Sequence, residues 1–194
     1  MLAQRSFYYL RHGETDWNRE RRQQGQSDIP LNETGRAQAR SVAGLLVDCG
    51  IATICTSPLR RARETAEIVN RAIDVPLVVI GDLIECNWGV QEGKVAGDWY
   101  DRWRRGGYIE GAEPHDRFVE RALGGINAAL CRLGPVLIVG HGGVYRAIKI
   151  HARLDIDFRL ANGVPVRHMP PSDETPCWMA QEMEPVHDPA TGEG

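Results

Sequence analysis

The sequence predicts an α/β domain with a largely parallel sheet. Short apolar runs alternate along the chain with segments of helical periodicity, which is the pattern of repeated strand–helix–strand units. The 194 residues, 42% of them hydrophobic, suffice for one buried core, whereas two full domains would be cramped. We therefore expect a single domain over residues 1–184 and a disordered tail over residues 185–194.

Each expected strand is a short apolar run, and each expected helix buries residues three and four positions apart. The first helix has Asn32 as a candidate N-cap and Gly50 at its end. A polar loop over residues 14–30 and an irregular segment over residues 81–115 interrupt the pattern, and a segment as long as the second is usually functional. The expected strands cover residues 6–10, 52–55, 77–80, 136–139, 164–167 and 177–182. The expected helices cover residues 34–49, 116–133 and 144–154, and a further helix after the second strand buries Ala62, Thr65, Ala66 and Val69.

The composition argues against several classes of protein. With 23 basic and 26 acidic residues and a net charge of −3, the chain lacks the basic footprint of a nucleic-acid-binding protein. No apolar stretch approaches the ~20 residues that would span a bilayer, and the N-terminus lacks the apolar core of a leader peptide. Five cysteines without a C-x-x-C pair indicate free thiols. We expect a cytoplasmic protein with no nucleic-acid partner and no membrane partner.

Histidines and arginines follow three of the expected strands. Arg11 and His12 come directly after the first strand. Arg60 and Arg61 follow the second strand, and His141 follows the fourth. Because ligands of open α/β sheets bind outside the carboxyl ends of the strands, we expect two histidines and up to three arginines to converge on one pocket.

Such a pocket suits a phosphoryl group, because guanidinium forks hold phosphate oxygens and offset their charge during transfer. Neutral imidazole is a competent nucleophile, and the cation of Arg11 should lower the pKa of His12. His141, protonated or as a neutral donor, would then bind the phosphoryl oxygens, and its glycine neighbours would allow the backbone to approach them. Glu85 is the best carboxylate for protonating the leaving oxygen, since a nearby phosphate should raise its pKa.

Two of these assignments have competitors. Arg61 could instead cap its own helix or pair with Glu64. Asp82 and Glu92 are close to Glu85 in the sequence and could take its place. The residue types alone leave both choices open.

Four segments, in this order, resemble the motifs of one family. They read R-H-G-E-T-D-W-N (11–18), S-P-L-R-R-A-R-E-T-A (57–66), E-C-N-W-G-V-Q-E-G (85–93) and V-G-H-G-G (139–143). Together they resemble the histidine phosphatase superfamily over residues 5–182. The resemblance implies a three-layer α/β/α sandwich, and with it we expect no metal and no cofactor.

The resemblance also implies roles by position. His12 would become phosphohistidine, and Glu85 would be the proton donor. Arg11, Arg61 and His141 would complete the catalytic phosphate pocket, Arg61 being the arginine before alanine in the L-x-R-A element. The substrate-binding positions would be Arg11, Asn18, Arg61, His141 and Gly142.

The chain departs from the family pattern in two places. It is shorter than the phosphoglycerate mutases of the family and has no room for their additional segment of paired arginines and prolines, which favours hydrolysis over mutase chemistry. Residues 110–114 read E-G-A-E-P where phosphatase members often have P-G-G-E-S, so substrate contacts from this loop are not carried over.

A basic run near two tryptophans has two interpretations. Arg102, Arg104 and Arg105 either recognise a second acidic group of the substrate or form a solvated helix face. The remaining histidines have no metal-ligand spacing, so we expect structural or surface roles for them. They are His115, His151, His168 and His187.

Two further patterns match other families by spacing alone. Cys55 and Arg61 satisfy the C-x5-R spacing of cysteine-dependent phosphatases. The loop between them has no glycine, Pro58 removes one N–H, and the histidines would be left unexplained. Gly140 begins a G-x-G pattern, but Tyr145 stands where a dinucleotide fingerprint needs its third glycine.

We therefore predict a metal-independent phosphomonoester hydrolase that acts through a phosphohistidine on a small phosphorylated metabolite. Phosphoglycerate mutase-type transfer to a second substrate hydroxyl is the alternative, and a catalytically silent phosphate-binding module is a remote one. The identity of the substrate stays open, as does the choice between a monomer and a homodimer.

Overall fold

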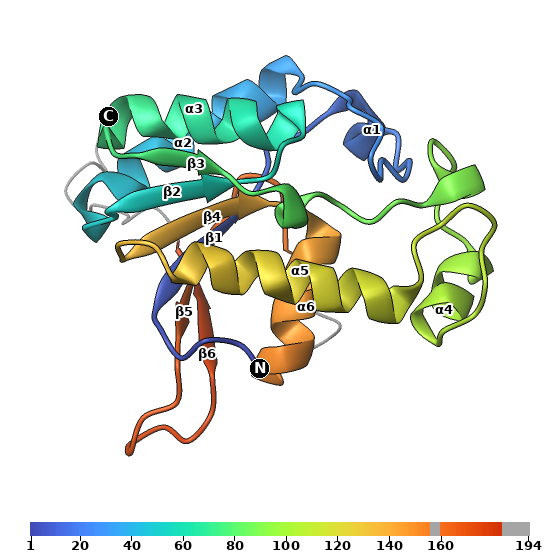
Figure 1. Cartoon of the computed structure of the whole chain (residues 1–194). Coiled ribbons are helices and arrows are strands. Elements are labelled where there is room, and N and C mark those ends of the chain that lie inside the picture. Colours follow the sequence, from blue (N-terminus) through green and yellow to red (C-terminus); the bar gives the residue numbers. More distant parts are fainter. Residues whose placement is uncertain (156–159, 184–194) are drawn as a thin grey trace, which may run out of the picture.

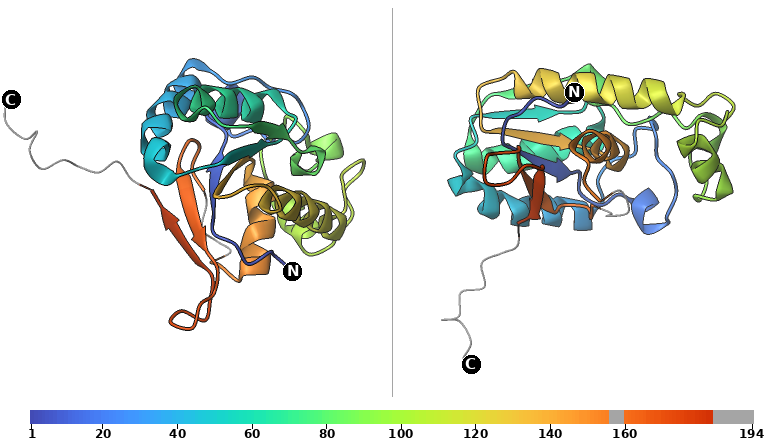
Figure 2. Two further views of the ribbon diagram at one scale, coloured as in Figure 1. Left: turned by 60° about the vertical axis from the view of Figure 1, so that its left-hand side comes forward. Right: turned by 90° about the horizontal axis from the view of Figure 1, so that it is seen from below.

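The computed structural model describes residues 1–155 and 160–183. In this part of the chain a six-stranded sheet lies between helices on both of its faces (Figures 1 and 2). The expected α/β/α sandwich is therefore confirmed. The tail expected over residues 185–194 lies outside the described residues.

The sheet has the strand order β3-β2-β4-β1-β5-β6. Its first four strands in that order run parallel, whereas β5 pairs antiparallel with β1, and β6 antiparallel with β5. The sheet is mostly parallel, as expected. The strands are β1 (Phe7–Arg11), β2 (Thr53–Thr56), β3 (Leu77–Val79), β4 (Val136–Gly140), β5 (Pro165–Met169) and β6 (Met179–Glu182).

The helices divide between the two faces of the sheet. α2 and α3 pack together on one face, and α5 and α6 pack together on the other (Figures 1 and 2). The helices are α1 (Asp16–Arg19), α2 (Glu33–Leu46), α3 (Arg60–Ile73), α4 (Asp98–Arg104), α5 (His115–Leu130) and α6 (Gly142–Ala152).

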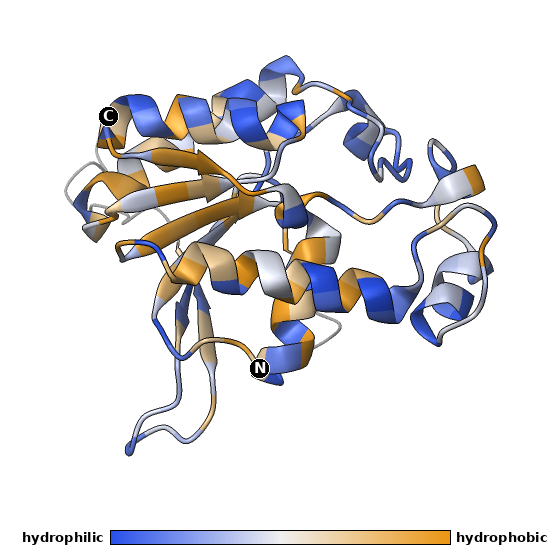
Figure 3. Ribbon diagram, in the orientation of Figure 1, coloured by the Kyte–Doolittle hydropathy of each residue, from blue (hydrophilic) through white to orange (hydrophobic). Residues whose placement is uncertain are grey.

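Side-chain alternation along β1 divides the core into two halves. Phe7 and Tyr9 join the cluster formed with α5 and α6, whereas Tyr8 and Leu10 join the cluster formed with α2 and α3. β4 is buried along its whole length, as a parallel strand covered on both faces requires. Figure 3 shows the central strands as mostly hydrophobic, whereas hydrophilic and hydrophobic residues alternate along the helices around them.

The expected helix signals are present. The Asn32 side chain accepts the N–H of Gly35 at 2.9 Å and caps α2. After a short 3₁₀ turn, Gly50 ends this segment in the left-handed region with φ 64°. Within residues 1–155 and 160–183, no helix has the length and apolar character needed to cross a membrane.

The segment over residues 81–115 is more regular than expected, because it contains α4. The polar loop before α2 likewise contains α1. Both helices have two turns or fewer, which is too short to produce a recognisable periodicity. Aromatic packing stabilises α4 instead: the rings of Trp103 and Trp88 meet edge to face with centroids 4.6 Å apart.

Candidate active site

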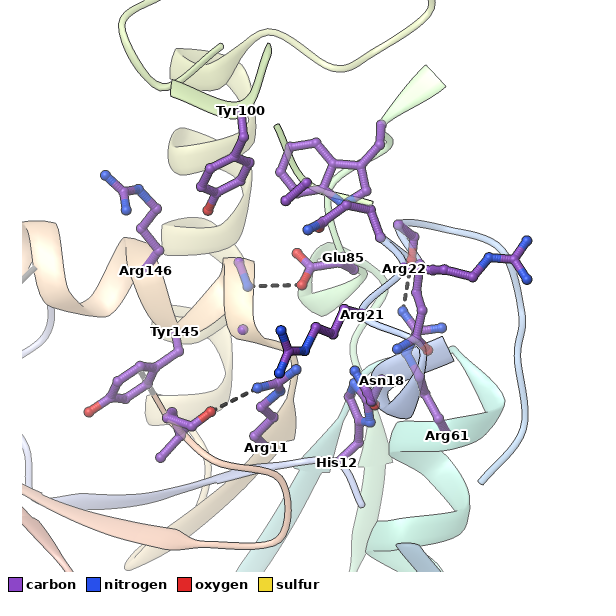
Figure 4. Close-up of a pocket in the computed structure, with 18 of the residues that line it drawn as sticks. Arg11, His12, Asn18, Arg21, Arg22, Arg61, Glu85, Tyr100, Tyr145 and Arg146 are labelled. Atoms are coloured by element: carbon purple, nitrogen blue, oxygen red, sulfur yellow. Dashed lines mark hydrogen bonds between the residues drawn. The ribbon is translucent and has the colours of Figure 1, made fainter. Parts of the chain in front are cut away.

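A pocket of about 870 Å³ lies beyond the carboxyl ends of the parallel strands (Figure 4). β2, β4 and β1 are neighbours in the sheet, so the residues that follow them meet at one edge. His141 is fully buried beside His12, with ring centroids 5.2 Å apart. The other expected site residues line the pocket directly: Arg11, His12, Asn18, Arg61, Glu85 and Gly142.

His12 has one ring nitrogen without a proton. Its Nδ1 lies 2.7 Å from the carbonyl oxygen of Gly13, which can only accept, so Nδ1 carries the proton and Nε2 keeps its lone pair. Burial, assisted by the charges of Arg61 and Arg11, holds the pKa of His12 well below its usual range. The expected lowering is present, and burial is a larger cause of it than the neighbouring cations.

The turn that carries His12 is held from several sides. The N–H of Gly13 donates to Oγ1 of Thr65 at 3.1 Å. A Cβ on Gly13 would collide with the backbone of Gly35, so the close approach of the turn after β1 to α2 requires glycine. The Asn162 amide donates to the main-chain oxygen of His12 at 2.8 Å. These contacts fix the imidazole relative to the sheet.

Both pocket arginines are largely buried. Arg61 is 1% exposed, burial lowers its pKa to about 10, and its terminal nitrogens donate to the carbonyls of Ser27 and Gly25 at 2.9 and 2.7 Å. Arg11 donates to the carbonyl of Leu160 at 2.8 Å, and burial lowers its pKa as well. Because buried charges are costly unless paired, two such cations side by side favour an anionic ligand.

The loop that holds Arg61 is anchored by Glu92. Its carboxylate accepts the N–H groups of Gln26 and Ser27, each at 2.8 Å. These bonds fix the stretch of chain between the two carbonyl groups that Arg61 contacts. Glu92 therefore stabilises the loop that positions Arg61, without lining the pocket itself.

The competing assignments fit the geometry poorly. Glu64 forms an ion pair with Arg36 at 2.6 Å, so it is engaged elsewhere than with the pocket arginine. Among the described residues, neither Asp82 nor Glu92 lines the pocket, whereas Glu85 does.

Glu85 is held at the pocket by two backbone donors. The N–H of Cys86 donates to its Oε1 and the N–H of Gly143 to its Oε2, both at 2.8 Å. Burial nevertheless raises the pKa of Glu85, outweighing these bonds and the charge of Arg61. A raised pKa suits a proton donor near neutral pH.

Arg121 anchors the chain that leads to Glu85. Its Nη1 donates to the carbonyl oxygens of Asp82 and Ile84, both at 2.9 Å. Its Nε and Nη2 form a forked pair with Glu113 at 2.9 and 2.7 Å, which fixes the guanidinium plane. Through Glu113, the segment over residues 110–114 thus helps to position the residues that precede Glu85.

His141 is oriented by Ser57, which the sequence did not single out. Its Nε2 lies 2.7 Å from Oγ of Ser57, and that oxygen accepts the N–H of Leu59 at 3.3 Å, so the hydroxyl proton is available to Nε2. Burial keeps the pKa of His141 well below its usual range, which favours the neutral donor over the protonated ring. When the Ser57 hydroxyl donates to Nε2, Nδ1 carries the ring proton, and Nδ1 has no partner among the described residues.

The sequence matches the model of one known family. The family described as "Histidine phosphatase superfamily (branch 1)" matches residues 7–168. The chain belongs to the histidine phosphatase superfamily. It is 39% identical over 142 residues to the uncharacterised phosphatase PhoE of Bacillus subtilis, covering 72% of either chain. It is 40% identical over 147 residues to the probable phosphoglycerate mutase GpmB of Escherichia coli, covering 70% of this chain and 68% of that one.

Solved structures show the same fold. A mycobacterial glucosyl-3-phosphoglycerate phosphatase in complex with VO3 superimposes with a TM-score of 0.79 at 26% identity, covering 91% of this chain and 97% of that one. The protein TTHB049 of Thermus thermophilus has a TM-score of 0.73 at 27% identity, covering 93% of this chain and 100% of that one. Membership of the histidine phosphatases supports an enzyme of phosphoryl hydrolysis or transfer.

In this member of the histidine phosphatase superfamily, the three arginines at the end of α4 lie in different places. Arg104 lines the pocket. Arg102 and Arg105 are exposed and line a separate hollow beside Trp99. Of the three, Arg104 alone is placed in the pocket, and a surface role fits the other two.

Four further cations of the pocket were missed from the sequence, and one of them, Arg22, donates to the carbonyl of Gly93 at 2.6 Å and stacks over Trp17. Arg146 and Lys149 line it from α6, where helical spacing from Gly142 is a signal that could have found them. Arg21 lines it from the turn after α1 and adopts a left-handed conformation with φ 58°. This is a position where helices usually place glycine, and another residue there costs roughly 1–2 kcal/mol.

Residues assigned to other patterns lie apart from the pocket. Cys55 is fully buried, and burial raises the pKa of its thiol to about 11, which is contrary to what a thiolate nucleophile requires. His115, His151 and His168 do not line the pocket, and His187 lies outside the described residues. Within the described ranges no group of three or more His, Cys, Asp or Glu residues is arranged to hold a metal ion.

Proposed function

We propose that the chain is a phosphomonoester hydrolase that works by double displacement without a metal ion. One arrangement carries the proposal: a neutral His12 with an unprotonated Nε2 lies beside the buried Arg61 and the partly buried Arg11, and a carboxyl group of raised pKa lines the same pocket. These are a nucleophile, an anion site and an acid.

In the first step Nε2 of His12 attacks phosphorus, and the bond from phosphorus to the ester oxygen breaks. Protonated Glu85 gives its proton to the leaving oxygen. Arg11 and Arg61 offset the charge of the phosphoryl oxygens, and the Nδ1–H of His141 is a further donor for them. The positive charge that develops on the His12 ring is stabilised by its hydrogen bond to Gly13.

In the second step a water molecule enters opposite the phosphorus–nitrogen bond. Glu85, now ionised, takes a proton from this water as its oxygen attacks phosphorus. The phosphorus–nitrogen bond breaks, inorganic phosphate leaves, and His12 and Glu85 return to their starting protonation states.

Phosphoglycerate mutase-type transfer is the second candidate function. The 40% identity to a probable phosphoglycerate mutase supports it. The same phosphohistidine would then pass its phosphoryl group to a substrate hydroxyl instead of water, with Glu85 taking the hydroxyl proton.

A panel of phosphate esters, assayed in EDTA, tests the mechanism. We expect wild type and Cys55→Ser to release phosphate, and His12→Ala to be inactive. Activity abolished by EDTA, or retained in His12→Ala and lost in Cys55→Ser, would contradict it. The same panel, with no turnover of any ester, would leave the silent binding module as the better description.

Following 3-phosphoglycerate by NMR separates hydrolysis from transfer. Hydrolysis yields glycerate and inorganic phosphate. Conversion to 2-phosphoglycerate without phosphate release would establish the mutase reaction instead.

A further inference from the structure

Tyr9 is a fully buried phenol that does not line the pocket and has no part in the proposed reaction. It lies on β1, and its ring packs against that of Tyr145 with centroids 5.0 Å apart. A buried hydroxyl group needs a hydrogen-bond partner, because burying it unpaired is costly. The partner of Tyr9 lies on another strand, at the edge of the sheet where the pocket opens.

The hydroxyl group of Tyr9 contacts the main chain of His141 twice. It donates to the His141 carbonyl oxygen at 2.7 Å and accepts the His141 N–H at 2.9 Å. Because the hydroxyl uses its proton and a lone pair on the same residue, it fixes the peptide groups on both sides of His141 relative to β1.

These two bonds take the place of a local helix cap. His141 is the N-cap residue of α6, and its side chain forms no capping bond. In a capping box the third helical residue supplies a carboxylate or an amide to the N-cap N–H, but that residue is Val144 here. Tyr9 instead satisfies this buried N–H, which a native structure rarely leaves unpaired. A side chain of β1 therefore holds the start of α6.

The residue before His141 leaves room for this hydroxyl. A Cβ on Gly140 would lie 2.5 Å from the hydroxyl oxygen of Tyr9, which is too close for a real contact. The carbonyl oxygen of Gly140 also accepts the N–H of His12 at 3.0 Å. Glycine thus permits the phenol to approach β4 at the point where that strand binds the main chain of the proposed nucleophile.

Two groups of the site depend on the position of the His141 main chain. The first is the His141 ring, whose Nε2 lies 2.7 Å from Oγ of Ser57. The second is the N–H of Gly143, two residues further along, which donates to Oε2 of Glu85 at 2.8 Å (Figure 4). A shift of the His141 main chain would move both the proposed phosphoryl donor and the anchor of the proposed acid. Small misplacements of such groups lower reaction rates strongly.

The phenol keeps its proton near neutral pH. Burial, assisted by the charge of Glu85, raises the pKa of Tyr9 well above its usual value. The O–H is therefore available as a donor whenever the proposed reaction runs. A group that neither titrates nor lines the pocket can act on the reaction only through the residues that it holds.

We propose that Tyr9 is a positioning residue of the active site, whose hydroxyl group holds His141 and the start of α6 in the geometry that the reaction requires. This inference rests on the proposed function for the roles of His141 and Glu85. A phenol that only filled the core could be replaced by phenylalanine at a cost in stability alone.

Tyr9→Phe removes the hydroxyl group and keeps the ring. Tyr8→Phe is the matched control, because it removes the hydroxyl of a buried phenol on the same strand, on the side that packs against α2 and α3. For an alkyl phosphate, kcat should fall about tenfold in Tyr9→Phe, the rate equivalent of one hydrogen bond, and stay close to wild type in Tyr8→Phe. KM should change little in both variants, because neither tyrosine lines the pocket.

¹⁵N NMR spectra test the geometry without turnover. In Tyr9→Phe the ring signals of His141 and the amide signal of Gly143 should shift, whereas in Tyr8→Phe both should match wild type. Urea unfolding of the two variants is measured alongside, so that a loss of stability is separated from a change in the site.

Gly140→Ala perturbs the same contact and leaves the hydroxyl group in the chain. Its Cβ would displace the Tyr9 hydroxyl, so kcat should fall in the wild-type background. In the Tyr9→Phe background, which lacks the colliding oxygen, the same substitution should lower kcat much less. If Tyr9→Phe does not fold, Gly140→Ala alone carries the test, with the same shifts of the His141 and Gly143 signals expected.

The outcomes separate this inference from the proposed reaction. An unchanged kcat in Tyr9→Phe of a chain that turns over, or unaltered ring signals of His141, would overturn the inference and leave the hydrolysis standing. Equal decreases of kcat in Tyr9→Phe and Tyr8→Phe would also overturn it. Shifted His141 and Gly143 signals in a chain that hydrolyses no ester would uphold the positioning of these groups by Tyr9 and defeat the proposed hydrolysis.

Discussion

The backbone N–H of Gly143 donates to Oε2 of Glu85 at 2.8 Å, and a Cβ on Gly143 would collide with the same carboxylate. The start of α6 and the proposed acid are therefore fitted to each other. Gly143→Ala should displace Glu85 and lower kcat by about 100-fold, since small misplacements of catalytic groups have effects of this size. Steady-state kinetics with an alkyl phosphate measures the loss.

Gly142→Ala is the matched comparison for this substitution. A Cβ there would lie 3.8 Å from Nε of Arg11, an ordinary contact. Its effect on kcat should be clearly smaller than that of Gly143→Ala. Equal decreases in kcat would show that both substitutions disturb the start of α6 and not the position of Glu85.

The pH dependence should report the environment of Glu85. Burial raises its pKa, and the protonated form is the active acid, so kcat/KM for an alkyl phosphate should fall as pH rises through that raised pKa. His12 has a depressed pKa, so no acid limb should appear near pH 6.5, its ordinary value. A limb of kcat at that pH would contradict the neutral histidine, whereas the second ionisation of the free ester, near about pH 6, affects only kcat/KM.

Glu85→Gln should separate esters by their leaving groups. For an alkyl phosphate, kcat should fall about 10²–10⁴-fold, because the leaving alkoxide needs a proton. For p-nitrophenyl phosphate, whose leaving group needs no proton, the rate of the phosphorylation step should fall much less. This rate is measured from the pre-steady-state burst. A similar loss in that step for both esters would argue against the role of proton donor.

Ser57 should act by fixing the ring of His141. Ser57→Ala should lower kcat roughly tenfold, the rate equivalent of about one hydrogen bond, and change the tautomer of His141 in ¹⁵N NMR spectra. Thr56→Val removes the neighbouring buried hydroxyl, whose hydrogen bond is long at 3.4 Å, and should leave the tautomer unchanged. An unaltered His141 signal in Ser57→Ala would refute the proposed orientation.

Acid should destabilise the fold partly through His168. It is fully buried, and burial lowers its pKa to about 4, so the unfolded chain binds its proton more readily. The free energy of unfolding is therefore not reduced by His168 above about pH 6.5, and it decreases as pH falls from there toward 4. When pH is lowered from 7 to 5, the free energy of unfolding measured in urea should decrease less in His168→Gln than in wild type, by a difference on the order of 2 kcal/mol. Equal losses would contradict the buried neutral ring.

His12, Arg61 and His141 could be predicted as one site because each follows a parallel strand, and such strand ends share an edge of the sheet. The placement of Glu85 depends on Arg121 and on Gly143, which are distant in sequence and leave no local signal. The helix α4 was missed for a different reason, because its seven residues are too few to show a helical period.

The cations beyond the phosphoryl site show a second limit. Arg21 is placed by a backbone conformation that its residue type disfavours, so local preference points away from the actual structure. Arg146 and Lys149 lie on a helix that the sequence did predict, but which of its faces lines the pocket depends on how α6 packs against the sheet.

A covalent intermediate on His12 is the most direct test of the account. Wild type and Glu85→Gln are mixed with substrate, quenched in alkali to preserve phosphohistidine, digested and mapped by mass spectrometry. We predict one phosphoryl group on the peptide that contains His12, at that histidine, and none in His12→Ala. A turning-over enzyme that yields no phosphorylated His12, or carries the phosphoryl group on another residue, would contradict the account.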